Sequence, residues 1–453
     1  MSTLAVVCQT VCEDLTITIN FRKVKPHIGN SIEEIVKRNT EIELTATTIR
    51  NYLNNEGLPE NTIDFHALIE TKFDYPDIAL DNPNNTAILP FSSGTTGLPK
   101  GVQLTHKNLV HNMLQNSHPE LKFKISATDS FQEVLPTMLP FYHAFGYSVV
   151  MNGLNLHGGK IVALPKFRPP SFISMLKEHQ QESTILYLVP PIVLLLTNDP
   201  NAKKEYLKNL RIIFTGAAPL AASDVEKFCR KFGDHITFLQ GYGLTETSPV
   251  VCSLWPSILD KEGSYRGSIG RPVPNTLMKV VDINDPKNTP LGPNVDGEIL
   301  IKGPQIMKGY LNLPEETKNI LTEDGWLRSG DIGHYNNNGY FFISDRLKEL
   351  IKVKGNQVPP AELEAIVRSF PGVAEAAVIG IPHDTKGEVP RAYVVGKIGE
   401  KLDIEALNQY VDDKVAKYKR LKGGIVVMEE IPKSATGKIS RRILKEMFLK
   451  DGI

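Results

Sequence analysis

The chain has 453 residues, of which 41% are hydrophobic and 23% are charged, a composition typical of a folded protein with two or three domains. Its 51 Lys and Arg residues balance 51 Asp and Glu residues, so no overall field draws it to nucleic acid or to anionic lipid. The four cysteines form no CxxC pair and no zinc-ligand spacing, which argues against a disulfide framework and a structural zinc site.

The chain carries no recognisable address to a membrane or an organelle. The apolar run at residues 4–11 lacks a preceding basic segment and soon meets Glu13 and Asp14, unlike a secretory signal peptide. No stretch approaches the ~20 apolar residues of a membrane span, and the chain ends at Ile453 rather than in a Ser-Lys-Leu type peroxisomal signal. These features predict a cytoplasmic location.

From about residue 86, short apolar runs alternate with amphipathic helical segments, the pattern of parallel α/β folds. Residues 211–215 predict a buried strand, residues 221–232 a helix with apolar side chains at helical spacing, and residues 236–239 the next strand. The first 60 residues have weak periodicity and predict no element. We therefore expect a large N-terminal domain, residues 1–345, built of parallel-rich sheets with helices.

The spacing changes at two places further along the chain. Between about residues 265 and 343, short strands are broken by Gly, Pro and Asn turns, which predicts a small antiparallel β subdomain. After Asp345 the chain becomes rich in lysine, and helices are predicted at residues 361–369 and from Asp403 onward. A smaller α+β C-terminal domain, residues 346–453, is expected there.

The segment FSSGTTGLPKGV at residues 91–102 has the composition of a phosphate-binding loop. Its glycines let backbone amides approach phosphate oxygens, its hydroxyls donate further hydrogen bonds, and Lys100 adds a positive charge. The spacing from Gly94 to Lys100 is not that of a Walker A loop. Composition alone leaves open a flexible surface loop of turn residues.

This run resembles the signature of the AMP-forming adenylating enzymes, which include acyl-CoA synthetases, 4-coumarate:CoA ligases, beetle luciferases and the adenylation domains of peptide synthetases. Further runs match motifs of this family in the same order: TGAAPL at 215–220, QGYGLTET at 240–247, GWLRSGD at 325–331, DRLK at 345–348 and PKSATGK at 432–438. The resemblance covers about residues 61–450 and is nearest to the 4-coumarate:CoA ligase and luciferase branch. It implies a C-terminal domain that moves on a hinge, and the use of ATP, Mg²⁺, a carboxylic acid and coenzyme A.

The resemblance assigns an ATP site, for which the residue types are suitable. The ring of Tyr242 can lie against adenine, with Gly216 and Ala217 leaving room for the base, while Asp331 can accept from the ribose hydroxyls and Arg346 can donate to ribose or phosphate. Without the resemblance, a core tyrosine explains Tyr242 equally well, and a surface or interdomain ion pair is favoured for Asp331 and Arg346. The ATP-binding residues implied are Ser92, Ser93, Gly94, Thr95, Thr96, Gly97, Lys100, Gly216, Ala217, Gln240, Gly241, Tyr242, Thr245, Asp331, Arg346, Gln357 and Lys438.

Adenylation joins two anions, so it needs alignment and charge neutralisation more than it needs a base. Thr245 suits the α-phosphate and Glu246 suits Mg²⁺, although a Thr-Glu pair alone is more often a helix start. The resemblance assigns Lys438 to bridging the carboxylate and the α-phosphate, and His143 to the wall of the acyl site. A lone histidine between aromatic residues is otherwise usually a core residue.

The resemblance also implies a second half-reaction on the same site. Lys348 matches the hinge position, at which the C-terminal domain turns to replace the face carrying Lys438 with a second face. The alternative for the lysines of that second face is a solvated basic surface. The residues implied are Lys352 and Gln357 for the adenylate, with Lys352 catalytic, and Lys166, Lys354 and Gly355 for coenzyme A.

Apolar residues around the histidine motif and after the Thr-Glu pair predict an apolar acyl pocket, which favours a fatty or phenylpropanoid-type acid. A carboxylate:CoA ligase is therefore the leading hypothesis, and the oligomeric state is left open. Relatives also leave a peroxisomal location open, although the C-terminal signal is lacking. The acyl-site residues are His143, Phe145, Tyr147, Val149, Val250 and Val251.

Two alternatives from other classes stay open. A luciferase-like oxygenase shares the branch, but Pro249 stands where luciferases are expected to have a pocket hydroxyl, and Asn112 offers no cation. A catalytically silent binding protein is suggested by the segment before the phosphate loop, which is shorter than in relatives. A parallel sheet lacking strands would expose unpaired edges and apolar surface.

Overall fold

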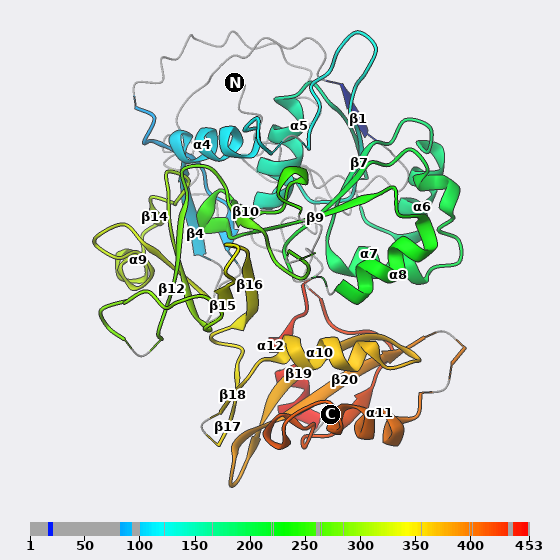
Figure 1. The fold of residues 1–453 in the computed structure, drawn as a ribbon, viewed down its shortest axis with the longest axis vertical. Coiled ribbons are helices and arrows are strands. Elements are labelled where there is room, and N and C mark those ends of the chain that lie inside the picture. The colour runs from blue at the N-terminus through cyan, green and yellow to red at the C-terminus, as the bar shows by residue number, and fades with distance from the viewer. Residues whose placement is uncertain are drawn as a thin grey trace, which may run out of the picture.

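The computed structural model describes the chain from residue 82 onward, with short gaps, and one earlier strand. Figure 1 shows a larger part that runs as far as β16 (Phe341–Arg346) and a smaller part that runs from β17 (Ile351–Val353) to the last helix. The described residues are 17–20, 82–92, 100–121, 123–164, 166–218, 220, 222–259, 263, 265–283, 285–354, 356–397, 399–400, 402–433 and 438–451.

The larger part contains two sheets with parallel strands. The first has the order β1-β6-β5 and the second the order β11-β10-β9-β8-β7, in which β7, β8 and β9 are parallel and β10 and β11 are antiparallel. The strands are β1 (Ile17–Asn20), β5 (Val134–Thr137), β6 (Lys160–Ala163), β7 (Ile185–Leu188), β8 (Ile212–Thr215), β9 (Thr237–Gly243), β10 (Val250–Ser253) and β11 (Arg271–Pro272).

Helices connect the parallel strands, as the alternating sequence pattern predicts. The segment before β6 is a π-helix, η1 (Phe145–Asn152), which continues into the short α5 (Gly153–Asn155). The other helices of this region are α4 (His106–Asn116), α6 (Pro169–Glu178), α7 (Pro190–Asn198), η2 (Lys204–Leu207), α8 (Ala222–Phe232), η3 (Thr245–Thr247) and η4 (Pro256–Ile258).

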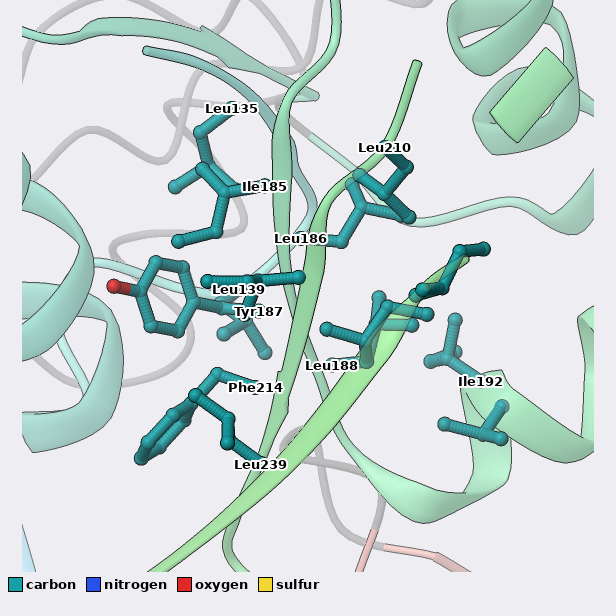
Figure 2. Packing of buried hydrophobic residues seen from close by; sticks show 14 of the residues in the cluster. Leu135, Leu139, Ile185, Leu186, Tyr187, Leu188, Ile192, Leu210, Phe214 and Leu239 are labelled. Carbon is teal, nitrogen blue, oxygen red and sulfur yellow. The ribbon is translucent and has the colours of Figure 1, made fainter. Parts of the chain in front are cut away.

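The central strands β7 and β8 are buried on both faces. Figure 2 shows Ile185 and Tyr187 on one side of β7 and Leu186 and Leu188 on the other, and all four side chains are inaccessible to solvent. Because both faces are covered, the strand is a continuous apolar run rather than an alternating one.

The antiparallel subdomain is present as a four-stranded sheet of order β12-β13-β15-β16, and a second small sheet places β14 beside β4. The sheet that contains β4 also carries the strand leading into the phosphate loop. The elements are β2 (Thr86–Ile88), β3 (Phe91–Ser92), β4 (Lys100–Thr105), β12 (Leu277–Val281), β13 (Gly297–Lys302), β14 (Gly309–Tyr310), α9 (Pro314–Ile320), β15 (Leu327–Tyr335) and β16 (Phe341–Arg346).

The smaller part is a sheet of order β18-β17-β20-β19, with β21 parallel to β20, and α10 packs on β19. The mixed α/β architecture confirms the fold class expected from the sequence. The elements are β17 (Ile351–Val353), β18 (Asn356–Val358), α10 (Pro360–Ser369), β19 (Val373–His383), β20 (Gly387–Gly396), α11 (Ile404–Asp412), η5 (Lys417–Lys419), β21 (Ile425–Val427) and α12 (Arg441–Asp451).

Candidate active site

A tyrosine, an aspartate and an arginine from three separate motifs meet where β9 of one sheet lies next to β15 and β16 of another. The Tyr242 hydroxyl at the end of β9 donates to Asp331 Oδ2 over 2.5 Å, and Arg346 Nε lies 3.2 Å from Asp331 Oδ1. Asp331 and Arg346 are direct partners in the register of β15 and β16. Burial raises the pKa of Asp331, and the charge of Arg346 opposes that shift. The three side chains are therefore held as one unit.

Lys438 reaches this unit from the C-terminal part of the chain. Burial and the charge of Arg346 lower the pKa of Lys438, while Asp331 and Glu246 raise it. Burial and the nearby Lys438 also lower the pKa of His143 to about 4, so the imidazole is neutral at pH 7. The structure thus brings Lys438, which the sequence placed in a distant loop, within electrostatic range of four predicted site residues.

Glu246 is a buried carboxylate in η3, next to Thr245. The Tyr310 hydroxyl donates to Glu246 Oε1 over 2.8 Å, and the Met307 amide donates to the Glu246 carbonyl over 2.9 Å. Within the described ranges, no group of three or more His, Cys, Asp or Glu residues is arranged to hold a metal ion. A single carboxylate fits Mg²⁺ when substrate phosphates and waters supply the remaining oxygen ligands.

Lys100, at the start of β4, is the first residue after the undescribed part of the phosphate loop. Its amine lies 2.5 Å from Glu316 Oε2 and 5.1 Å from the centre of the Tyr310 ring. Ser92 is buried at the other end of the loop. The predicted residues Ser93, Gly94, Thr95, Thr96 and Gly97 lie outside the described residues.

Gly216, which follows β8, lies beside Gly241 of β9, because the two strands are hydrogen-bonded neighbours and Thr215 pairs with Gln240. A Cβ on Gly216 would lie 3.5 Å from the Gly241 carbonyl oxygen, and one on Gly241 would lie 2.3 Å from the Phe214 ring. Ala217 has a φ of 71°, in the left-handed region that non-glycine residues rarely adopt. These positions adjoin the end of β8, where the resemblance places the base.

Three of the predicted acyl-site residues, Phe145, Val149 and Val250, share one core cluster, whereas Val251 and Tyr147 pack in two other clusters. Phe145, Val149 and Val250 are buried, and His143 Nδ1 accepts a hydrogen bond from the Phe145 amide over 3.2 Å. From the sequence alone, Asn112 is notable only because it cannot supply a positive charge. In the structure Asn112 is buried, and its side-chain amide donates to the Val250 carbonyl over 2.6 Å. Its amide fixes β10 at the edge of the acyl site.

The residues assigned to the second half-reaction are not brought to this site. Lys352, Lys354 and Gln357 are exposed on the β17–β18 hairpin, which Figure 1 shows in the smaller part, away from β9 and β15. Lys354 has a φ of 49°, as a two-residue hairpin turn requires. Gly355 lies outside the described residues, and Lys166 is exposed on the larger part.

The segment around Lys348 connects the two parts through a turn in which the Glu349 amide donates to the Arg346 carbonyl over 2.9 Å. Lys348 itself is exposed. Asp345, three residues earlier, is buried, and its Oδ2 accepts from the Ala361 amide at the start of α10 over 2.9 Å. A side chain on one side of the turn therefore holds a helix on the other side.

Sequence reasoning missed several residues that shape this site. Tyr310 and Glu316 belong to no motif, and they reach the site because β14 pairs with β4 and α9 follows it. Asp345 was quoted only as the start of a motif. The sequence did contain one signal for Asp345. The helix that follows has Pro359 as its N-cap, and a proline side chain cannot accept a hydrogen bond from the helix amides, so the acceptor has to come from another residue.

Comparison with known proteins identifies the family. The protein-family model described as AMP-binding enzyme matches residues 8–311 of this chain, and the family model described as AMP-binding enzyme C-terminal domain matches residues 362–438. The chain belongs to the AMP-binding enzyme family. The match starts well before residue 61, where the motif resemblance began. The AMP-binding enzymes it resembles include acid–CoA ligases, and the chain is an enzyme of this AMP-forming acid–thiol ligase type.

Curated relatives come from the branch that the motifs indicated. Probable 4-coumarate–CoA ligase 1 of Dictyostelium discoideum is 39% identical over 421 residues, covering 92% of this chain and 73% of the relative. Probable 4-coumarate–CoA ligase 3 of the same organism is 43% identical over 82% of this chain and 65% of the relative. Luciferin 4-monooxygenase of Nipponoluciola cruciata is 39% identical over 83% and 66%, respectively.

Solved structures support the same fold. The ATP-bound MatB of Rhodopseudomonas palustris has a TM-score of 0.73 and 31% identity, covering 84% of this chain and 71% of MatB. The Bacillus subtilis o-succinylbenzoate CoA synthetase in complex with ATP and magnesium has a TM-score of 0.68 and 29% identity, covering 84% and 75%. Among the described residues, none of the helices is both long and apolar enough to cross a membrane.

For this AMP-binding enzyme we predict that Asp331→Ala raises the dissociation constant for ATP about tenfold, because buried Asp331 is the expected acceptor for the ribose hydroxyls and its loss leaves them unpaired at a cost of ~1–3 kcal/mol. Calorimetric titration with ATP measures the change. Asp296→Ala removes an exposed carboxylate and is the matched control. Equal ATP affinity in the wild type and Asp331→Ala would contradict the assignment.

Proposed function

We propose that this chain activates an apolar carboxylic acid, of the fatty or phenylpropanoid type, with ATP and Mg²⁺ and then transfers the acyl group to coenzyme A. The observation that carries the proposal is that Lys438 lies within electrostatic range of Arg346 and of the buried carboxylates of Asp331 and Glu246. A lysine delivered by the C-terminal part to a tyrosine, aspartate and arginine unit supplies positive charge where two anions must approach.

In the first step a substrate carboxylate oxygen bonds to the α-phosphorus of ATP, and the bond from that phosphorus to the bridging oxygen breaks to release pyrophosphate. The ammonium of Lys438 and the hydroxyl of Thr245 would stabilise the charge that builds on the α-phosphate. Mg²⁺ bound near Glu246 would neutralise the phosphates. His143 is neutral at pH 7, so it can shape the acyl site without repelling Lys438.

In the second step the coenzyme A sulfur bonds to the acyl carbon, and the carbon–oxygen bond to AMP breaks. Lys352, Lys354 and Gln357 are far from the Asp331 unit in this structure, so we propose that the C-terminal part turns about Lys348 between the steps. The turn would withdraw Lys438 and present the β17–β18 hairpin. One buried site would then serve both half-reactions in sequence.

The acid is proposed from the lining of the acyl site. Phe145, Val149 and Val250 are buried, apolar and packed in one core cluster, in which the Phe145 ring lies next to Gly216. Such a lining favours an acid with an apolar body over acetate or an amino acid.

The test is a mass-spectrometric screen for acyl-CoA and AMP over a panel of fatty, aromatic and short acids, with controls lacking ATP or coenzyme A. We expect thioesters from apolar acids only when both co-substrates are present. ATP binding without pyrophosphate release on any acid would instead indicate a silent binding protein.

A luciferase-like oxygenase is the second candidate, because luciferin 4-monooxygenases stand among the relatives at 39% identity. Pro249, in the position where a pocket hydroxyl is expected, disfavours it. Light emission with luciferin, ATP and oxygen, without formation of a luciferin thioester, would establish the oxygenase in place of the ligase.

A further inference from the structure

Lys100, the lysine of the phosphate loop, is paired with a carboxylate of the protein itself. Its ammonium donates to Glu316 Oε2 over 2.5 Å. The hydrogen bond with Lys100 and the charge of Lys100 lower the pKa of Glu316, so the carboxylate is ionised at pH 7. A cation that the resemblance assigns to phosphate is therefore already bound to an anion.

The fold brings Glu316 to Lys100 through strand pairing rather than through sequence proximity. β14 pairs with β4, which begins at Lys100, and α9 lies next to β14 (Figure 1). The Tyr310 amide at the end of β14 donates to the Thr317 hydroxyl over 2.9 Å, which fixes the first turn of α9 to the strand. Glu316 stands in that first turn. The ion pair is thus a built contact between two anchored elements.

Tyr310 keeps the Lys100 ammonium close to the residue expected to bind Mg²⁺. The ammonium lies 5.1 Å from the centre of the Tyr310 ring, and the Tyr310 hydroxyl donates to Glu246 Oε1 over 2.8 Å. Burial and the charge of Glu246 raise the pKa of Tyr310, so its hydroxyl stays protonated and donates. Phosphates that bind near Glu246 would therefore compete with Glu316 for the same ammonium.

The two partners of the ion pair differ in how far water reaches them. The Lys100 side chain is 18% exposed, whereas that of Glu316 is 47% exposed. Glu316 can therefore move into solvent when a phosphate takes its place, and the charge of Lys348 also acts on it from the hinge. An ion pair with one exposed partner is weak enough for a charged ligand to break.

We propose that Glu316 competes with the β- and γ-phosphates for Lys100 and is a positioning residue for pyrophosphate release. The inference rests on the proposed function, since it assigns the phosphates of ATP to Lys100. Glu316 holds Lys100 while the site is empty, and ATP displaces it. Glu316 then takes Lys100 back as pyrophosphate leaves.

The charge of the leaving group explains why a carboxylate is useful at this position. When the bond to the α-phosphorus breaks, the former bridging oxygen gains negative charge, so pyrophosphate is more highly charged than the same two phosphates within ATP. Fixed cations therefore hold the product tightly, and product release limits many enzymes. A glutamine at residue 316 would accept the same hydrogen bond without offering a competing charge.

The experiment is a calorimetric titration with pyrophosphate and with AMP, both with Mg²⁺ and without any acid. In Glu316→Gln we expect the Kd for pyrophosphate to fall about threefold, the scale of one partly exposed ion pair. The Kd for AMP should stay unchanged, because its single phosphate is expected at Thr245 and Lys438. Glu315→Gln removes an exposed carboxylate that pairs with Lys318, and as the matched control it should bind pyrophosphate like the wild type.

A double-mutant comparison separates competition for Lys100 from a general loss of negative charge. In a Lys100→Met background, adding Glu316→Gln should leave the Kd for pyrophosphate unchanged. Equal pyrophosphate affinity in the wild type and Glu316→Gln, no pyrophosphate binding by the wild type, or a threefold effect that persists in Lys100→Met would overturn the inference. A chain that shows the expected binding pattern but activates no acid would contradict only the proposed function.

Discussion

Replacing Lys438 with alanine is expected to slow acyl-adenylate formation by about 10²–10³-fold, the scale found when one preorganised charge-stabilising group is lost. The ammonium lies within electrostatic range of Arg346, Asp331 and Glu246, two of which, Asp331 and Glu246, are buried carboxylates. Thioester formation from a supplied acyl-adenylate should stay within a factor of a few, because the proposed second orientation withdraws Lys438. Pyrophosphate exchange and single-turnover thioester assays measure the two steps.

Lys433→Ala provides the control for this prediction. Lys433 precedes the same loop but pairs with Glu375 within the C-terminal part, 2.6 Å between Nζ and Oε2. Both half-reactions should continue in this variant. If Lys438→Ala slowed both half-reactions equally, Lys438 would not act in adenylation alone, and the division of labour between two orientations would be wrong.

Much of the fold follows from local pattern. The run at residues 211–215 forms β8, the amphipathic segment at 221–232 forms α8, and Asp403 caps α11 through the Ala406 amide, as its residue type predicts. These elements are predictable because burial periodicity and capping are properties of neighbouring residues. By contrast, the stretch from Phe145 to Asn152 is uniformly apolar, and its π-helical form has no signal in periodicity.

The candidate site was predictable as a set of residues but not as an arrangement. The motifs supplied Tyr242, Asp331 and Arg346, yet the hydrogen bond between the tyrosine and the aspartate depends on how two sheets meet. Tyr310 and Glu316 carry no motif, since they reach the site through strand pairing across more than two hundred residues. Long-range register is not encoded in any single segment, so these contacts required the structure.

The contact between Asp345 and α10 leads to a second prediction with a large effect, on the ratio of the rates of the two half-reactions. Asp345 Oδ2 accepts from the Ala361 amide over 2.9 Å, and Asp345 caps a helix whose N-cap is a proline. Turning the C-terminal part about Lys348 would break this bond and expose the carboxylate. Asp345 therefore holds the orientation that presents Lys438.

The negative charge on Asp345 has the opposite effect: it destabilises this orientation, because the carboxylate is buried in it. Burial raises the pKa of Asp345 from its ordinary value of 3.8 to about 6, so this orientation binds the proton more tightly than one in which the carboxylate is exposed. As pH rises from about 4 to about 6, Asp345 ionises first in the orientation that exposes it. The orientation that buries Asp345 therefore loses up to ~3 kcal/mol of stability relative to the exposed one. Above about pH 6 the carboxylate is ionised in both orientations, and their free-energy difference no longer changes with pH. Lowering the pH from 7 to 5 should therefore favour the Lys438 orientation.

Two substitutions at Asp345 should then shift the ratio by different amounts. Asp345→Asn keeps an acceptor for the Ala361 amide and removes the buried charge, so at pH 7 it should favour adenylation over thioester formation by up to about a hundredfold and abolish the pH dependence of their ratio. Asp345→Ala removes the buried charge and also the cap, worth about 1 kcal/mol, so it should shift the ratio in the same direction but less far. We expect the two variants to differ by about fivefold in the ratio of the half-reactions, the factor that the free energy of the cap represents.

Hydrogen exchange of the Ala361 amide provides a direct readout of the same equilibrium, since the amide is protected only while Asp345 accepts from it. Protection should rise in Asp345→Asn, in step with the ratio of the half-reactions, and fall in Asp345→Ala, which offers the amide no acceptor. Asp324→Asn changes an exposed carboxylate that accepts from the Thr322 hydroxyl and should alter neither measurement. If Asp345→Asn left the ratio and its pH dependence unchanged, the carboxylate would not act as a charged latch, and the orientation would have to be held by other contacts of the hinge, such as the turn from Arg346 to Glu349.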